Sequence, residues 1–268
     1  MPEGPEVRII VDQLNHLLQN SELLSIEITS GRYSKKAPDN FTNFSSCLPL
    51  KIKEVKCKGK FIWFELEGWY IFNTLGMSGG WKLESEKHSH LTWLTNKATV
   101  YFTDMRNFGT FKFIKNKSEL DKKLKELGTD ALSPEYTLDY VKKVLGEKKS
   151  QTKTLAGILM NQKKFCGIGN YLKSEILYAS KLSPHRTLES LTSDDITTLF
   201  HQSKKIIQAS YDNGGGSAGD FSDLNKKKGS YKFQFQVYGR THDPLGNKVK
   251  KETTQDKRTT HWVPTVQC

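Results

Sequence analysis

The sequence has 268 residues, with 41 Lys and Arg against 29 Asp and Glu, and a formal net charge of +12 at pH 7. Its 36% of hydrophobic residues is sufficient to bury a core, which excludes a wholly disordered chain. No apolar run is long enough to span a bilayer, and residues 1–6 (MPEGPE) do not resemble a leader peptide. We therefore expect an intracellular protein with no membrane partner, in the nucleus, the cytoplasm or a viral replication compartment.

The basic residues are concentrated in the second half of the chain. Residues 1–130 carry 19 basic and 16 acidic side chains, whereas residues 131–268 carry 22 and 13. Such an excess favours a polyanionic partner, with nucleic acid as the first candidate and an anionic membrane surface as the second. An excess of lysine is also found in proteins where it only increases solubility, so the composition does not decide between these alternatives.

The first 130 residues predict one helix, then a series of short strands, then a second helix. Apolar residues between Val7 and Leu18 recur at helical spacing, and Pro5 stands near the first helical position, where its missing N–H costs nothing. A lysine-rich amphipathic helix is expected at 118–127. Short strands at this spacing predict a sandwich or barrel flanked by helices. The strands are expected at 25–29, 61–66, 70–73, 91–94, 99–103 and 111–114.

A linker is indicated at residues 128–134 (GTDALSP), which divides the chain into domains 1–130 and 131–268. Beyond it, residues 214–229 predict a long loop. The sequence thus predicts an α+β protein of two domains, a β-rich N-terminal one and a helical C-terminal one that ends in a hairpin. The helices are expected at 138–145, 154–161, 171–180 and 194–208, the last with Ser193 as N-cap, and the strands at 231–238, 248–253 and 259–263.

The N-terminus carries a candidate reactive group. A small second residue permits removal of Met1, which would expose the secondary amine of Pro2. Such an amine forms an iminium with an aldehyde carbon and is therefore a covalent catalyst. Glu3 and Glu6 lie beside it as candidate proton carriers. Two carboxylates near a terminus are common by chance, and a Met-Pro start by itself indicates only processing.

A collinear set of motifs supplies a second signal. Residues 1–8 (MPEGPEVR) resemble the opening of the Fpg/Nei family of DNA glycosylase/AP lyases, and residues 4–6 (GPE) are closer to the Nei side. The resemblance implies a catalytic β-sandwich domain, and a DNA-binding domain with a helix–two-turn–helix element and a hairpin finger. It continues in order through 58–61 (KGKF), 75–79 (LGMSG), 103–109 (TDMRNFG), 166–171 (CGIGNY), 174–177 (SEIL), 237–240 (VYGR) and Arg258.

The resemblance also implies the chemistry of a bifunctional glycosylase/lyase. Pro2 would attack C1′ of the damaged nucleoside and expel the base. The resulting iminium would acidify the C2′ proton, so that the 3′ and then the 5′ phosphate leave by elimination. Glu3 matches the acid that protonates the opening deoxyribose, Glu6 a supporting carboxylate, and Lys60 a lysine that clamps phosphates beside the lesion. Without the resemblance, Lys60 would be assigned to the solvated face of a lysine-rich strand.

Five further residues match positions that hold DNA in the family. Met77, Arg106 and Phe108 would fill the gap left by an everted nucleotide, although Met and Phe are more often core residues. Asn170 is expected to cap the following helix, whose free N–H groups can hold a phosphate. Arg258 lies in a polar turn and matches an arginine that grips phosphates flanking the flipped nucleotide.

The C-terminal hairpin departs from the pattern of family members that carry a four-cysteine zinc finger. Residues 242–248 contain no cysteine, so we expect no metal and no cofactor, as in the zincless finger of the Nei-like branch. His242, His261 and Cys268 are the remaining ligand candidates, but their spacing fits no standard zinc motif. A disulfide framework is also disfavoured, because no C-x-x-C pair occurs among Cys47, Cys57, Cys166 and Cys268.

We therefore expect a monomeric base-excision-repair enzyme whose partner is damaged DNA, double- or single-stranded. The Nei-like opening favours oxidised pyrimidines and ring-fragmented purines over 8-oxoguanine opposite cytosine. The main alternative is a non-catalytic DNA-binding protein that retains the fold, which the presence of Pro2, Glu3 and Lys60 disfavours. A proline-amine tautomerase would need only the N-terminus and would leave the second domain without a purpose.

Overall fold

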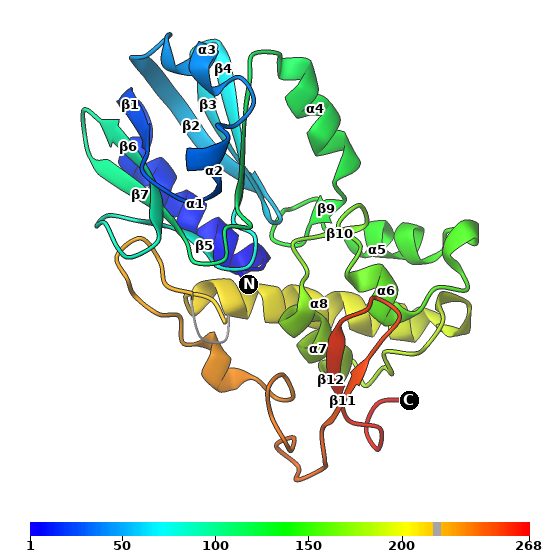
Figure 1. Cartoon of the computed structure of the whole chain (residues 1–268). Helices are drawn as coiled ribbons and strands as arrows, with labels where there is room; N and C mark the ends of the chain where they lie inside the picture. Colours follow the sequence, from blue (N-terminus) through cyan, green and yellow to red (C-terminus); the bar gives the residue numbers. More distant parts are fainter. Residues whose placement is uncertain (217–220) are drawn as a thin grey trace.

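The computed structural model describes residues 1–216 and 221–268, which form two lobes joined side by side (Figure 1). The first lobe begins with helix α1 (Gly4–Leu18) and then contains β1 (Glu22–Ile28), two short helices, α2 (Arg32–Lys35) and α3 (Phe41–Ser45), seven further strands and helix α4 (Lys117–Glu126). The strands are β2 (Leu50–Lys58), β3 (Phe61–Leu66), β4 (Trp69–Thr74), β5 (Gly79–Lys82), β6 (Ser89–Thr95), β7 (Thr99–Asp104) and β8 (Thr110–Ile114).

The eight strands form one antiparallel sheet, in the order β5-β7-β6-β1-β2-β3-β4-β8, which is folded over on itself. Only two residue pairs join β1 to β2, so the sheet turns at this point. Its two halves then pack face to face: the Phe64 ring on β3 lies 5.5 Å from Trp81 on β5 and 4.6 Å from Trp93 on β6, between ring centroids. No pairing between β5 and β8 closes the sheet among the described residues. The predicted sandwich flanked by helices is confirmed.

Helix α1 packs its apolar face on the sheet, mainly against β2. Its first turn holds Pro5, as the sequence predicts, and the buried stripe includes Val7, Ile10, Leu14 and Leu18. The polar residues at its N-terminus are buried as well, because the second lobe covers that end. The N-terminus therefore lies at the junction of the two lobes.

The second lobe is mainly helical and has its own apolar core. Helix α7 packs against α8, and a two-stranded hairpin packs against α7 (Figure 1). Whether the domains divide at residue 130 stays a prediction. The elements are β9 (Thr129–Asp130), α5 (Leu138–Leu145), η1 (Lys148–Ser150), α6 (Leu155–Leu159), β10 (Phe165–Cys166), α7 (Asn170–Ala179), η2 (Leu188–Ser190), α8 (Ser193–Asp212), η3 (Tyr231–Gln234), β11 (Lys250–Thr253) and β12 (Thr259–Trp262).

Predictions for the start of α8 and for residues 231–238 are wrong. The N-cap of α8 is Thr192 rather than Ser193, because Thr192 Oγ1 accepts from Asp195 N at 3.1 Å and Asp195 Oδ2 accepts from Thr192 N at 2.9 Å. Residues 231–238 form a 3₁₀ turn and a loop instead of a strand. Within the described ranges, no helix is long and apolar enough to cross a membrane.

Candidate active site

Three glycines allow the backbones of the two lobes to meet at the N-terminus of α1. Gly4 N donates to Gly167 O at 2.9 Å, and a Cβ on Gly59 would lie 2.5 Å from Gly167 N. Gly59 and Gly167 also have positive φ values of +57° and +94°, which L side chains rarely adopt. The motifs around residues 4, 59 and 167 are therefore parts of one contact between the lobes.

Glu3 directs its carboxylate at the N-terminus of α7. Its Oε1 accepts from Tyr171 N at 3.0 Å and its Oε2 from Leu172 N at 3.3 Å, so it binds two N–H groups of the first turn. Gly169 is required beside it, because a Cβ there would lie 2.2 Å from Glu3 Cδ. Glu3 is only 3% exposed. Burial raises its pKa to about 7, against the opposing effect of the nearby Lys60 ammonium.

Glu6 is fully buried, and its carboxylate accepts hydrogen bonds from three different segments of the chain. Its Oε2 accepts from Glu3 N at 2.7 Å, and its Oε1 accepts from the Tyr171 hydroxyl at 2.8 Å and from Gly216 N at 2.7 Å. With all these bonds made inside the protein, Glu6 fixes the start of α1 against α7 and against the chain that follows α8.

Lys60 lies in the two-residue turn between β2 and β3, not in a strand as its lysine-rich surroundings suggest. Its Nζ donates to Ile168 O at 2.9 Å, across the junction of the lobes. Burial lowers its pKa, whereas Glu3 acts in the opposite direction. Lys60 is thus a cation held beside the Glu3 carboxyl rather than a solvated lysine.

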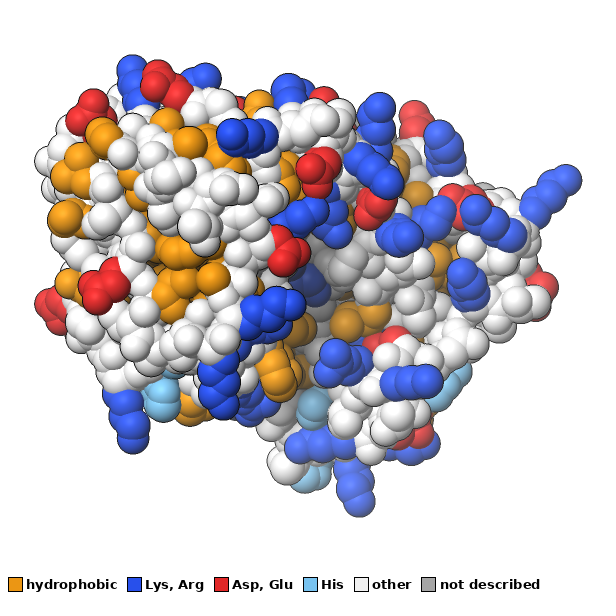
Figure 2. Space-filling model, turned by 45° about the horizontal axis from the view of Figure 1, so that its top comes forward, with side chains coloured by type: hydrophobic (Ala, Val, Ile, Leu, Met, Phe, Trp, Pro, Cys, Tyr) orange, Lys and Arg blue, Asp and Glu red, His pale blue; other side chains and the backbone are white. Residues whose placement is uncertain are grey.

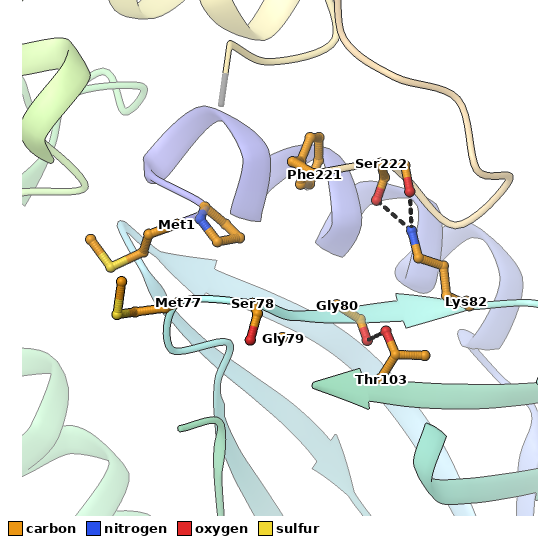
Figure 3. Close-up of a pocket in the computed structure, with 10 residues that line it drawn as sticks. Met1, Met77, Ser78, Gly79, Gly80, Lys82, Thr103, Phe221 and Ser222 are labelled. Carbon is orange, nitrogen blue, oxygen red and sulfur yellow. Dashed lines mark hydrogen bonds between the residues drawn. The ribbon is translucent and has the colours of Figure 1, made fainter. Parts of the chain in front are cut away.

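Pro2 is buried behind Met1 and lines a small cavity of about 30 Å³. The same cavity is lined by Met77 and Gly80 at the start of β5 and by Phe221 and Ser222 beyond α8 (Figure 3). A second cavity, of about 170 Å³, joins four of the predicted site residues, Glu3, Met77, Asn170 and Arg258, with Met1, Met160, Tyr171 and Tyr238.

Met77, Arg106 and Phe108 lie on two adjacent turns, before β5 and between β7 and β8. Met77 is 36% and Phe108 55% exposed, which excludes a core role for either. Arg106 Nη1 lies 3.6 Å from Met77 Sδ. The buried Asp104 joins the two turns, because its carboxylate accepts from Ser78 Oγ at 2.6 Å and from Gly109 N at 2.6 Å. The three predicted residues therefore form one protruding edge.

The prediction that Asn170 caps α7 is wrong. The N-cap is Gly169, and Asn170 is the first residue of the helix. Two of the N–H groups that were expected to hold a phosphate bind Glu3 instead. Asn170 Nδ2 donates to Thr259 O at 2.9 Å and thereby attaches the hairpin to α7.

Arg258 is exposed at the end of the turn between β11 and β12. Protein contacts dock this hairpin on the helices. Lys173 and Asp256 form an ion pair at 2.6 Å that is almost wholly buried, and Gln255 Oε1 accepts from Thr154 N at 3.0 Å. These contacts fix the β11–β12 hairpin, and with it the position of Arg258 in the lining of the second cavity.

The metal-ligand candidates do not form a cluster. His261 packs against Tyr238, with ring centroids 4.8 Å apart, whereas His242 is exposed and Cys268 is the exposed last residue. No group of three or more His, Cys, Asp or Glu side chains in the described part of the chain is arranged to hold a metal ion.

Several residues of the site were not assigned a role from the sequence. Glu175 is buried, and its carboxylate accepts from the backbone N of residues 236, 237 and 238, which places Tyr238 in the larger cavity. Tyr171 binds Glu6, and Asp104 holds the two turns. In the sequence, these three residues were marked only by their positions in the motifs at 174–177, 166–171 and 103–109.

Lys and Arg side chains gather around a hollow between the two lobes (Figure 2). Both cavities described above are at the junction of these lobes. The arrangement combines the buried Glu3 carboxyl with its raised pKa, the half-buried Lys60, the exposed edge of Met77, Arg106 and Phe108, and cationic walls. Such walls favour an anionic ligand.

Comparison with known proteins finds three family models along the chain. They are the formamidopyrimidine-DNA glycosylase N-terminal domain at residues 1–111, its H2TH domain at 127–222 and its C-terminal domain at 224–268. The formamidopyrimidine-DNA glycosylase of Streptococcus agalactiae is 30% identical over 252 residues, which cover 91% of this chain and 90% of that protein. The enzyme of the same name from Listeria innocua is 29% identical, with 98% of each chain covered.

Solved structures show the same similarity. The Thermus thermophilus MutM (Fpg) protein superposes with a TM-score of 0.86 at 27% identity, over 99% of this chain and 98% of that one. A Lactococcus lactis Fpg mutant in complex with a Fapy-dG containing DNA gives a TM-score of 0.87 at 26% identity, with 99% of each chain covered. Wild-type Lactococcus lactis Fpg, in complex with an oxidised pyrimidine containing DNA, gives 0.85 at 26% identity, again over 99% of each chain.

Proposed function

The chain belongs to the formamidopyrimidine-DNA glycosylase family, and we propose that it is a bifunctional DNA glycosylase and AP lyase of base excision repair that removes oxidised pyrimidines and ring-fragmented purines. The observation that carries the proposal is the buried Glu3 carboxyl, with its pKa raised to about 7, beside Lys60 and next to Pro2 in the chain. The substrate classes are supported by the related Fpg structures with Fapy-dG and oxidised-pyrimidine DNA.

In the proposed reaction, removal of Met1 frees the Pro2 amine at the wall of the smaller cavity. The positive end of the α1 dipole favours the unprotonated amine. Its lone pair attacks C1′, and the base departs with the electrons of the glycosidic bond and takes up the proton that the amine loses. The nitrogen lone pair then expels the ring oxygen from C1′ to form the iminium, and Glu3 gives its proton to that oxygen as the deoxyribose opens. A carboxyl with a pKa near neutrality is suited to donate that proton.

The second half of the reaction is strand cleavage. The iminium on Pro2 draws electrons from C2′, whose proton is lost while the C3′–O bond breaks and the 3′ phosphate leaves. A second elimination releases the 5′ phosphate. Lys60 and Arg258 hold the flanking phosphates during these steps, together with Asn170. Asn170 and Arg258 line the larger cavity together with Glu3, and Lys60 lies close enough to Glu3 and Arg258 for their charges to affect its pKa, which supports this assignment.

The exposed edge formed by Met77, Arg106 and Phe108 fills the gap that the extruded nucleotide leaves in the duplex. Phe108→Ala is expected to slow base release from a paired lesion about tenfold, because one aromatic stacking contact is worth about 1–3 kcal/mol. On single-stranded DNA the loss should be smaller, since no opposite base needs support. Single-turnover assays on both substrates test this.

The same assay tests the proposed function as a whole. The wild-type protein is expected to release the damaged base and cleave the strand, and to leave an undamaged duplex intact. Tight binding without any base release would favour the alternative, a non-catalytic DNA-binding protein. If Phe108→Ala lowers base release equally on paired and single-stranded lesions, this would contradict the gap-filling role of Phe108.

The hairpin is proposed to work without zinc, because the Lys173–Asp256 ion pair and the Gln255 and Asn170 contacts already dock it. Purified protein should contain far less than one zinc ion per chain and stay active in a chelator. Arg258→Ala should lower base release roughly tenfold or more, as for a lost charge-assisted hydrogen bond, with the melting temperature unchanged. Tightly held zinc that is lost together with activity would contradict the metal-free hairpin.

A further inference from the structure

Lys82, at the end of β5, is a buried lysine whose side chain makes all of its hydrogen bonds to one distant segment. Its side chain is only 6% exposed. Nζ donates to Ser222 O at 2.7 Å and to Ser222 Oγ at 2.5 Å (Figure 3). It also donates to Asp223 O at 2.8 Å. An ammonium group has three protons, so this segment accounts for all of them.

A second side chain holds the same segment from α1. Gln13 Nε2 donates to Asp223 Oδ2 at 2.7 Å, and Gln13 Oε1 accepts from Leu224 N at 3.0 Å. Phe221 and Leu224 are also packed in the core of the first lobe, although they follow α8 of the second lobe in the chain. Residues 221–224 are therefore fixed to the first lobe by two polar clamps and two buried apolar side chains.

This clamped segment is a wall of the cavity that contains Pro2. Phe221 and Ser222 line it together with Pro2, Met77 and Lys82. The Ser222 hydroxyl oxygen already accepts a hydrogen bond from Lys82 Nζ. Among the described residues its own proton meets no acceptor, so it is available to donate to a group that enters the cavity.

We propose that Lys82 is a positioning residue for base removal, which orients the Ser222 hydroxyl to donate to a carbonyl oxygen of the extruded, oxidised base. The inference rests on the proposed function and adds a recognition contact to it. Oxidised pyrimidines and formamidopyrimidines carry such carbonyl groups, and the contact exists only while the base is attached. Lys82 and Ser222 thus act on base release and not on the cleavage of abasic DNA.

The test compares four variants of the full-length protein on two substrates, a duplex with one oxidised pyrimidine and the same duplex with one abasic site. Lys82→Met is expected to slow single-turnover base release about tenfold or more, and Ser222→Ala about fivefold, the size expected for one lost hydrogen bond. Both should cleave the abasic duplex at close to the wild-type rate. Lys82→Arg should restore part of the base release.

Lys87→Met is the matched control, because Lys87 is an exposed lysine of the turn that follows β5. It should behave as wild type on both substrates. Ser222→Ala keeps the two backbone contacts of Lys82, so it remains informative if Lys82→Met fails to fold. Equal losses on the two substrates, or no loss on either, would overturn the inference. A wild-type protein that releases no base would instead contradict the proposed function.

Discussion

Glu3→Gln is expected to lower base release about 100-fold or more, because the amide cannot give a proton to the opening deoxyribose. Cleavage of abasic DNA should fall much less, since the base is already absent. The pH dependence of base release should also differ between the wild-type protein and Glu3→Gln. Wild-type base release should decline as pH rises above about 7, where Glu3 loses its proton, whereas the residual activity of Glu3→Gln should not follow that decline.

The same pKa has a consequence for stability. Burial raises the pKa of Glu3 from 4.5 to about 7, so the folded protein binds this proton more tightly than the unfolded chain does. The free energy of unfolding should then decrease as pH rises from about 5 to 7, by up to roughly 3 kcal/mol. Glu3→Gln should lack this decrease. Parallel stability profiles for the two proteins, measured by urea unfolding at several pH values, would contradict the assigned protonation.

Gly59→Ala is expected to destabilise the protein by about 3 kcal/mol or more and to impair base release. The added Cβ would lie 2.3 Å from Cys166 Sγ and 2.5 Å from Gly167 N, so the lobes would have to separate there. Lys60 is the next residue, and its bond to Ile168 O crosses the same contact. Urea unfolding and single-turnover base release measure the two effects.

Gly68→Ala is the matched control for this substitution. Gly68 also lies in a hairpin turn, between β3 and β4, and has a similar φ of +70°, but nothing lies within 4 Å of its Cβ position. It should cost only the backbone strain of a left-handed residue, about 1–2 kcal/mol, with normal activity. Equal destabilisation by the two alanines would mean that the close approach of the lobes contributes nothing.

Most helices and strands were predicted correctly where the apolar period is undisturbed. The strand β3 (Phe61–Leu66) and the helix α5 (Leu138–Leu145) have the predicted bounds. A strand was expected around Lys56 and Lys58, but the bounds of β2 (Leu50–Lys58) were not predicted, because its alternation of apolar and charged residues is interrupted where the register shifts between Ile52 and Glu54. Strand β5 was missed because it is short and contains Gly79 and Gly80.

Two of the wrong predictions are at positions where a distant residue supplies the hydrogen bonds. Residues 231–238 have the alternation of a strand, but Glu175 binds three of their backbone N–H groups in place of a neighbouring strand. Similarly, Glu3 binds the N-terminus of α7 and leaves Asn170 free to attach the hairpin. Local patterns contain no information about such partners, whereas the motifs did place Glu3, Lys60, Asn170 and Arg258 in one region.

The most direct test of the proposed chemistry is borohydride reduction during the reaction of the processed protein with an oligonucleotide that contains one abasic site. Reduction converts the proposed iminium into a stable bond between protein and DNA. We expect an adduct that maps to the N-terminal peptide at Pro2 and is strongly reduced in Pro2→Gly. An adduct at an internal lysine, formed in normal yield by Pro2→Gly, would contradict the assignment of Pro2 as the nucleophile.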